Sequence, residues 1–207
     1  MALLNPNPPV RGSARALHPS RLRTAGRLAA FFCCLLGCLT PRAALHAQAA
    51  TAREYQLKAV FLFNFAQFVA WPPPAFAAPD APMVIGVLGE DPFHKTLDDT
   101  VRGEKVEGHP IAIERYRRVE DLKTCHVLFV CRSEIAHLDQ ILARLKGQPV
   151  LTVGDVEGFA QRGGMIRFVN DNNKVRFRIN VEAAKAANLT ISSKLLRPAD
   201  IVAPGKD

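Results

Sequence analysis

Hydrophobic residues run almost without interruption from Ala59 to Ala78, a stretch that contains no charged side chain. At about 100° per residue, the polar side chains around it fall within one sector of a helix about 80° wide. They are Arg53, Gln56, Asn64 and Gln67. The prolines at 72–74 cannot continue a helix, so the pattern predicts a helix over residues 54–71.

This helix is too short to span a membrane. Its uncharged part has about 13 residues, whereas a membrane span requires roughly 20. The pattern therefore predicts a buried helix with one narrow polar stripe. The helix also carries four phenylalanines, Phe61 among them, and so many aromatic side chains could instead cover a dimer or partner surface.

The rest of the chain alternates short apolar runs with helical patterns. Continuous apolar runs at 82–89, 126–130 and 149–153 predict strands that are covered on both faces, and alternation over 109–116 predicts a half-buried strand. Helices are predicted over 92–103, capped by Asp91, and over 134–147. A hairpin is predicted around 171–173, then a helix from about Val181 and a final short helix capped by Ser193.

This order of elements predicts an α/β fold, a three-layer sandwich with a mostly parallel sheet, an antiparallel hairpin edge and helices on both faces. We expect a single domain over residues 54–202, followed by a flexible tail at 203–207. The sequence contains no internal repeat and no low-complexity segment that would indicate a second domain.

The net charge of +8 comes mainly from the first 47 residues. They hold six arginines and no acidic residue, which leaves 21 of the 27 basic residues against all 19 acidic ones in the remainder. Because basic and acidic residues are nearly equal in number after residue 47, the net charge gives no reason to expect nucleic-acid binding.

The same 47 residues have the composition of a secretory signal peptide. An arginine-rich segment precedes an apolar run at 28–39, which is too short to span a membrane, and small residues at Ala47 and Ala49 suit cleavage. We expect a periplasmic protein that does not itself span the membrane. A lipoprotein anchored at Cys38 is the alternative.

Two cysteines remain after such cleavage, Cys125 and Cys131. If the residues between them form a strand, their α-carbons lie about 20 Å apart on the same sheet face. A disulfide needs less than about 7 Å, so two reduced core thiols are favoured over a redox bridge. A bridge would require this segment to fold back, and it stays open as a redox alternative.

The motifs of common enzyme classes are missing from the sequence. Gly86 and Gly89 fit neither a dinucleotide-binding nor a phosphate-binding loop, so we expect no nucleotide cofactor. The histidines lack metal-ligand spacing, and Ser192, Ser193 and Lys194 lack the spacing of an acylating serine. We therefore predict no catalytic residue, no cofactor and no metal site.

Three acidic residues are expected at one edge of the sheet. Glu90 and Asp91 follow one predicted strand and Asp155 follows another, where open α/β sheets place their ligand sites. The simpler interpretation is that Asp91 and Asp155 cap the helices that follow. The functional interpretation is a crevice for a cationic or hydroxyl-rich ligand.

Seven segments in chain order carry a family resemblance: LKAVFLFNFAQFVAWP, IGVLGEDPF, CHVLFV, LTVGD, FAQRGGMIRFV, NKVRFRIN and ISSKLL. Together they resemble the YfiR family of periplasmic regulators over about residues 54–202. The resemblance implies an exported, often homodimeric α/β protein without a catalytic role. It also implies a partner, the periplasmic sensor domain of an inner-membrane diguanylate cyclase. Inhibition of that enzyme would lower cyclic di-GMP and disfavour biofilm formation.

Two positions depart from the family pattern. Gln67 stands where a lysine is expected, and Arg178 stands where an acidic residue is common. Interfacial charges set partner specificity, so Arg178 suggests a different partner surface. The candidate partner-contact or ligand-binding residues are Phe61, Asn64, Gln67, Glu90, Asp91, Asp155 and Arg178. The alternative function is a small-molecule-binding accessory module of a membrane sensor kinase.

Overall fold

The computed structural model describes residues 41–171, 174–203 and 205, with side chains from Gln48 onward. The chain divides into two compact units, residues 1–47 and 48–207. The fold and the sites below belong to the second unit. The predicted signal peptide lies mostly outside the described residues, as does part of the predicted tail, so both stay predictions.

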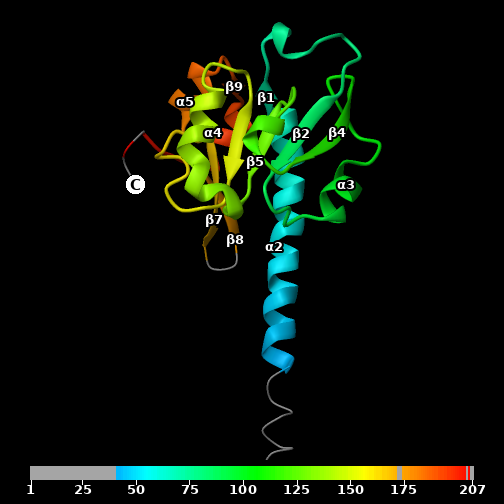
Figure 1. Ribbon diagram of the computed structural model, residues 1–207, viewed down its shortest axis with the longest axis vertical. Helices are drawn as coiled ribbons and strands as arrows, with labels where there is room; N and C mark the ends of the chain where they lie inside the picture. The colour runs from blue at the N-terminus through cyan, green and yellow to red at the C-terminus, as the bar shows by residue number, and fades with distance from the viewer. Residues whose placement is uncertain (1–40, 172–173, 204, 206–207) are drawn as a thin grey trace, which may run out of the picture. The chain divides into compact units, whose positions relative to one another are not determined.

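The described residues form helices and strands in alternation (Figure 1). The helices are α2 (Pro41–Phe68), η1 (Pro73–Ala75), α3 (Lys95–Val101), η2 (Val119–Asp121), η3 (Arg132–His137), α4 (Leu138–Leu145), α5 (Val181–Ala186) and α6 (Ser193–Leu196). The strands are β1 (Val69–Ala70), β2 (Met83–Leu88), β3 (Lys105–Val106), β4 (His109–Tyr116), β5 (Val127–Val130), β6 (Leu151–Gly154), β7 (Ile166–Asp171), β8 (Lys174–Ile179), β9 (Thr190–Ile191) and β10 (Asp200–Ile201).

One sheet of eight of these strands forms the centre of the domain, in the order β10-β8-β7-β6-β5-β2-β4-β3. Neighbouring strands from β4 through β2, β5 and β6 to β7 are parallel, while the β7–β8 hairpin and the β3–β4 pair are antiparallel. The short strand β10 pairs in parallel with the outer side of β8. The predicted mostly parallel α/β sandwich is therefore confirmed, although β10 lies beyond the predicted hairpin edge.

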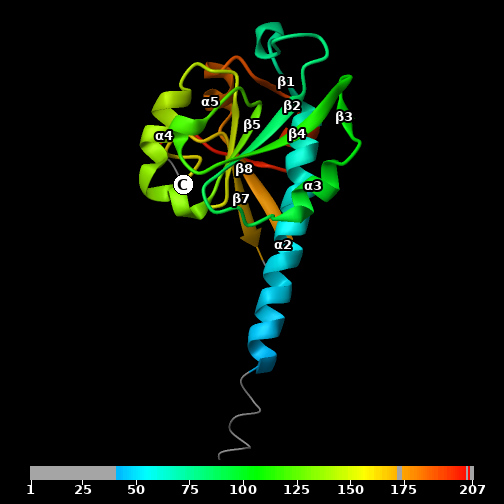
Figure 2. The ribbon, with the colours of Figure 1, turned by 45° about the vertical axis from the view of Figure 1, so that its right-hand side comes forward.

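Helices cover both faces of this sheet (Figure 2). On one face, α2 and α3 bury the larger apolar cluster, in which Phe65 packs against Phe168 and Phe177 at ring distances of 5.5 and 5.6 Å. On the other face, α4 buries a smaller cluster around Leu138, Ile141 and Phe159. Side chains therefore leave β5 alternately toward each face, which explains its unbroken apolar sequence.

Several helix boundaries differ from those predicted. Helix α2 ends at Phe68 rather than at residue 71, because Val69 and Ala70 pair with β9 before the prolines are reached. Helix α3 begins at Lys95, and Asp91 does not cap it. The Asp91 carboxylate instead accepts the backbone N–H of Phe93 in the preceding turn. The final short helix is capped by Ser192 rather than by Ser193.

Cys125 and Cys131 are both buried and free, as the sequence favoured. The prediction that they share a sheet face is wrong, because Cys125 lies in the cluster under α4 and Cys131 in the cluster under α2. Regular strand geometry covers only Val127–Val130, so the alternation of side chains does not extend back to Cys125. Burial raises the pKa of the Cys125 thiol to about 12.

Candidate functional site

A buried ion pair joins helix α2 to the carboxyl end of β6. The Lys58 ammonium lies 2.6 Å from Oδ2 of Asp155, and both side chains are 2% exposed. Lys58 also contacts the Glu54 carboxylate at 2.6 Å, one helical turn earlier. Asp155 therefore does not cap a following helix, since its carboxylate is turned toward α2.

Two further donors complete the surroundings of Asp155. The Tyr55 hydroxyl donates to Oδ2 at 2.8 Å, and Nε of Arg132 donates to Oδ1 at 3.2 Å. Burial by itself would raise the pKa of Asp155, but the hydrogen bonds from Lys58 and Tyr55 and the charges of Lys58 and Arg132 outweigh it and hold the pKa below its usual range. The carboxylate is therefore ionised and fully engaged by protein donors.

A cavity of about 410 Å³ opens beside this cluster. It lies at the carboxyl ends of β5 and β6, and β7 extends past them as one wall. Its lining is Arg132, Ile135, Asp155, Val156, Glu157, Arg167, Phe168, Val169 and Asn170. The Nε atom of Arg167 is buried and makes no hydrogen bond within the described residues.

The reversal of strand order, between β2 and β5, is where open α/β sheets usually bind ligands. Here the chain itself fills that crevice. The backbone N–H of Glu90 donates to the Ser133 hydroxyl at 3.0 Å, and a Cβ added at Gly89 would lie 2.3 Å from the same oxygen. Glycine at position 89, with φ +98°, is what allows η3 to approach this closely.

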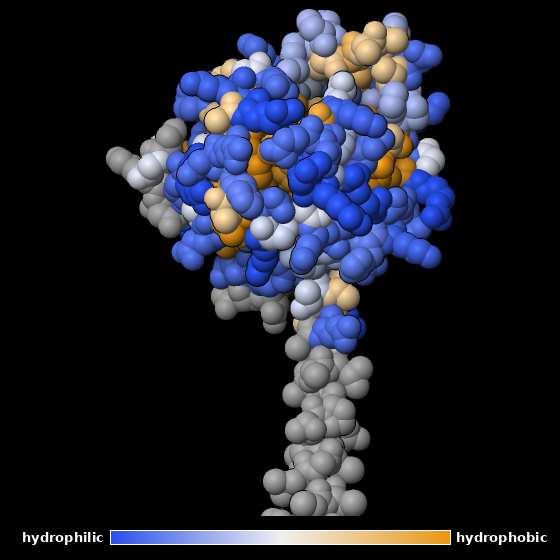
Figure 3. Space-filling view, viewed as in Figure 1, coloured by the Kyte–Doolittle hydropathy of each residue, from blue (hydrophilic) through white to orange (hydrophobic). Residues whose placement is uncertain are grey.

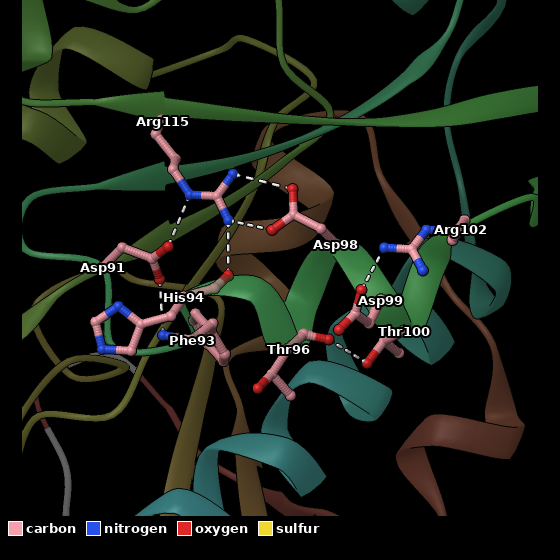
Figure 4. A network of polar contacts seen from close by, with 9 residues as sticks. All are labelled: Asp91, Phe93, His94, Thr96, Asp98, Asp99, Thr100, Arg102 and Arg115. Atoms are coloured by element: carbon pink, nitrogen blue, oxygen red, sulfur yellow. Dashed lines mark hydrogen bonds and ion pairs between the residues drawn. The ribbon is translucent and has the colours of Figure 1, made fainter.

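Asp91, the second acidic residue predicted at this edge, is also neutralised by the chain (Figure 4). The Arg115 guanidinium donates to Asp91 at 2.7 Å, to Asp98 and to the carbonyl of His94. The hydrogen bond from Arg115 lowers the pKa of Asp98. Glu90, Asp91 and Asp155 thus lie near one sheet edge, but cations of the protein contact the two aspartates.

The outer face of α2 carries the remaining predicted contact residues. Asn64 is half-buried and Gln67 is exposed, whereas Phe61 packs on Phe168 and Phe177 at the core. Two apolar side chains precede these polar residues on the same helix face. Leu57 is 43% exposed and Val60 is 40% exposed, so the stripe is partly hydrophobic.

A groove of about 420 Å³ continues this face toward the β7–β8 hairpin. It is lined by Ala50, Thr51, Arg53, Glu54, Leu57, Asn170 and Val175. The face drawn in Figure 3 is mainly hydrophilic, with hydrophobic residues in small separate patches. Among the described residues, the exposed large hydrophobic side chains are Leu57 and Val60 on α2 and Ile201 on β10.

Arg178, the last of the predicted contact residues, lies on β8 opposite Arg167 of β7. It is half-buried. Within the described residues, no group of three or more potential ligands could hold a metal ion, and no helix is long and apolar enough to cross a membrane.

The profile of the YfiR/HmsC-like family (DUF4154) matches residues 55–200, which is most of the described domain. The chain belongs to this family. YfiR/HmsC-like proteins are periplasmic regulators that act with membrane signalling proteins, and the family is regulatory rather than catalytic.

No curated protein matches the chain at a significant level. Among solved structures, one similar chain is the ABC domain in complex with L-Trp from Streptococcus pneumonia. It is 11% identical with a TM-score of 0.44, and the match covers 58% of the present chain and 55% of that chain. So weak a likeness bears on neither fold nor function.

The ion cluster of this YfiR/HmsC-like domain was only half visible in its sequence. The position of Asp155 at the end of an apolar strand indicates a candidate site residue, whereas Lys58 gives no such signal within a helix whose sequence is almost wholly apolar. The usable signal was Glu54 four residues before Lys58, a spacing that places the two charges on one helix face.

Proposed function

We propose that this YfiR/HmsC-like protein binds the periplasmic sensor domain of an inner-membrane diguanylate cyclase and holds that enzyme inactive. The observation that carries the proposal is the pair of exposed apolar side chains, Leu57 and Val60, on the outer face of α2. In a protein of a regulatory family, such exposure next to a groove supports a docking surface for another protein.

The contact surface we infer extends from this pair along α2. Asn64 and Gln67 follow Leu57 and Val60 on the same helix face and would supply polar contacts at the rim of the interface. Phe61 lies beneath them and would position the helix rather than form the contact, because it packs against the β7–β8 hairpin.

A binding role also suits the chemistry of the ion cluster. Asp155 is held by Lys58, Tyr55 and Arg132, so none of these groups is poised as a free base or nucleophile. The cluster instead ties α2 to β6 and fixes the helix that presents Leu57 and Val60. Export to the periplasm and assembly as a homodimer belong to the same proposal.

The test is co-purification from membranes. A tagged copy of the full chain, expressed in its own cells, is expected to retain a membrane diguanylate cyclase after gentle solubilisation. A Leu57→Asp/Val60→Asp double variant should lose it, since both side chains are exposed and the fold should tolerate the change. Ala136→Asp, at an exposed position on η3, is the matched control and should retain the enzyme. Equal recovery with both variants would contradict the proposed surface.

A second candidate function is that of a small-molecule-binding accessory module of a sensor kinase. It is favoured by the cavity of about 410 Å³, because the two arginines that line it, Arg132 and Arg167, would suit a ligand that carries an anionic group. A thermal-shift screen of small carboxylates and phosphates tests it. A specific rise in melting temperature that disappears in Arg167→Gln but persists in an Arg176→Gln control would support this function.

A further inference from the structure

The outer edge of β8 is only partly covered by another strand. Strand β10 pairs with β8 at Arg178 and Ile179, and no other described strand lies on that side of β8. The segment 174–177 is therefore the end of the sheet in the part of the chain that the structure describes. An uncovered edge presents backbone N–H and C=O groups that can pair with a further strand.

The hydrogen-bond phase of the hairpin shows which residues present these groups. The N–H of Asn180 donates to the carbonyl of Met165 at 2.8 Å, so the even-numbered residues of β8 pair with β7. The odd-numbered residues then direct their backbone groups away from β7. Ile179 agrees, because its carbonyl accepts the N–H of Val202 on the outer side at 3.0 Å. The parallel pairing of Arg178 with Asp200 also places the N–H of Asp200 on the carbonyl of Phe177, so the outward groups beyond β10 are those of Val175 and the N–H of Phe177.

Side chains on the two faces of this edge differ in kind. Val175 lies on the α2 face and lines the groove that also contains Leu57. Lys174, Arg176 and Arg178 share the opposite face, where Arg176 forms an ion pair with Asp171 at 3.1 Å. The edge is therefore basic on one face and apolar on the other.

This charge pattern determines which kind of strand can pair with the outer edge of β8. If a second copy of the chain paired antiparallel through β8, Arg176 would lie opposite Arg176 of that copy, or opposite Lys174 in the neighbouring register. Like charges directly opposite one another destabilise a strand pair. An extended segment with alternating acidic and apolar residues would instead place carboxylates beside the basic face and apolar side chains over the groove.

We propose that the edge of β8 at Val175–Phe177 binds the partner by β-strand addition, and that the partner supplies an extended segment of alternating acidic and apolar residues. This inference rests on the proposed function and deepens it, because it specifies how the signalling partner is held. Backbone pairing would give affinity, and the Val175–Leu57 groove together with the basic face would give specificity.

The test uses proline at a position of β8 where it removes an outward donor. Val175→Pro deletes an N–H that the β7 ladder does not use, and proline is tolerated at edge positions whose N–H faces outward. Val175→Ala is the matched control, because it shortens the side chain and keeps the donor. The probe is the purified periplasmic domain of the membrane cyclase that co-purifies with the wild-type chain, and the dissociation constant is measured with each full-length variant.

We expect Val175→Pro to weaken binding at least about tenfold relative to Val175→Ala, since it loses a backbone hydrogen bond and its ring blocks the approaching strand. A Lys174→Glu/Arg176→Glu variant should also weaken binding and reduce its dependence on salt, which keeps the inference testable if the proline variant fails to fold. The proposal that the β8 edge binds the partner would be refuted by equal affinity of the proline and alanine variants, or of the charge-reversed variant and wild type. The proposed function would then remain intact. If no cyclase co-purifies with the wild-type chain, the proposed function itself fails, and this assignment of the edge fails with it.

Discussion

Removing the ammonium of Lys58 should be one of the most damaging single changes in this domain. In Lys58→Met the side chain remains long and apolar, so packing on α2 is largely kept. The Asp155 carboxylate, 2% exposed, loses its closest cation at 2.6 Å. It would then be a buried charge supported only by Tyr55 and by Arg132.

The expected cost follows from this loss. Breaking a buried pair by removing one partner typically costs about 3–5 kcal/mol. The donors from Tyr55 and Arg132 remain, so we expect a loss near the lower end, about 3 kcal/mol in the free energy of unfolding. For a domain of this size that corresponds to a fall in melting temperature of about 6–12 °C.

Urea unfolding of the purified protein at pH 7, followed by circular dichroism, measures this loss. Lys95→Met removes an exposed lysine at the start of α3 and should change stability by less than about 0.5 kcal/mol. The double variant Lys58→Met/Asp155→Asn should be more stable than Lys58→Met alone, because the uncompensated charge is gone. A cost below about 1 kcal/mol for Lys58→Met, or strictly additive single changes, would refute the reasoning.

Three other changes have definite expected outcomes. His126 is buried, accepts the N–H of Val84 and donates to the carbonyl of Ala75, and burial lowers its pKa. The stability that His126 contributes is therefore present above its unfolded pKa near 6.5 and is lost as pH falls through the lower folded value. In His126→Gln, the free energy of unfolding measured between pH 7 and 5 should depend less steeply on pH. Cys125 and Cys131 should react with a thiol reagent only after denaturation, and rapid reaction of the native protein would contradict their burial. Gly164→Ala should destabilise by about 1–3 kcal/mol in a thermal melt, since the added Cβ would lie 2.2 Å from the buried ring of Phe159, and an unchanged melting temperature would contradict that packing.

The sequence predicted the layers of the fold because long apolar runs and helical spacing are local signals. The strands β2, β4, β5 and β6 and the hairpin appear close to their predicted ranges. The two-residue strands β1, β3, β9 and β10 were not predicted. Strands β1, β9 and β10 exist only through partners distant in sequence, whereas β3 is the short arm of a tight turn into β4. The early end of α2 has the same cause, because Val69 and Ala70 pair with residues about 120 positions later.

The candidate site was harder to predict, because its contacts join distant segments. Asp155 could be placed at the sheet edge from strand order, but its contact with Lys58 spans 97 residues and depends on how α2 packs. Arg115 and its contact with Asp91 were likewise invisible, since a strand residue gives no sign of which loop it faces. The exposure of Leu57 and Val60 could not be predicted either, because the sequence pattern assigns apolar residues of a helix to the core.

The most direct test of the central claim is the cellular level of cyclic di-GMP in a deletion strain, compared with its parent and with a complemented strain. If the protein holds a membrane diguanylate cyclase inactive, deletion raises cyclic di-GMP, wild-type complementation restores it, and the Leu57→Asp/Val60→Asp variant does not. An unchanged level on deletion, under growth conditions in which the gene is expressed, would contradict the account.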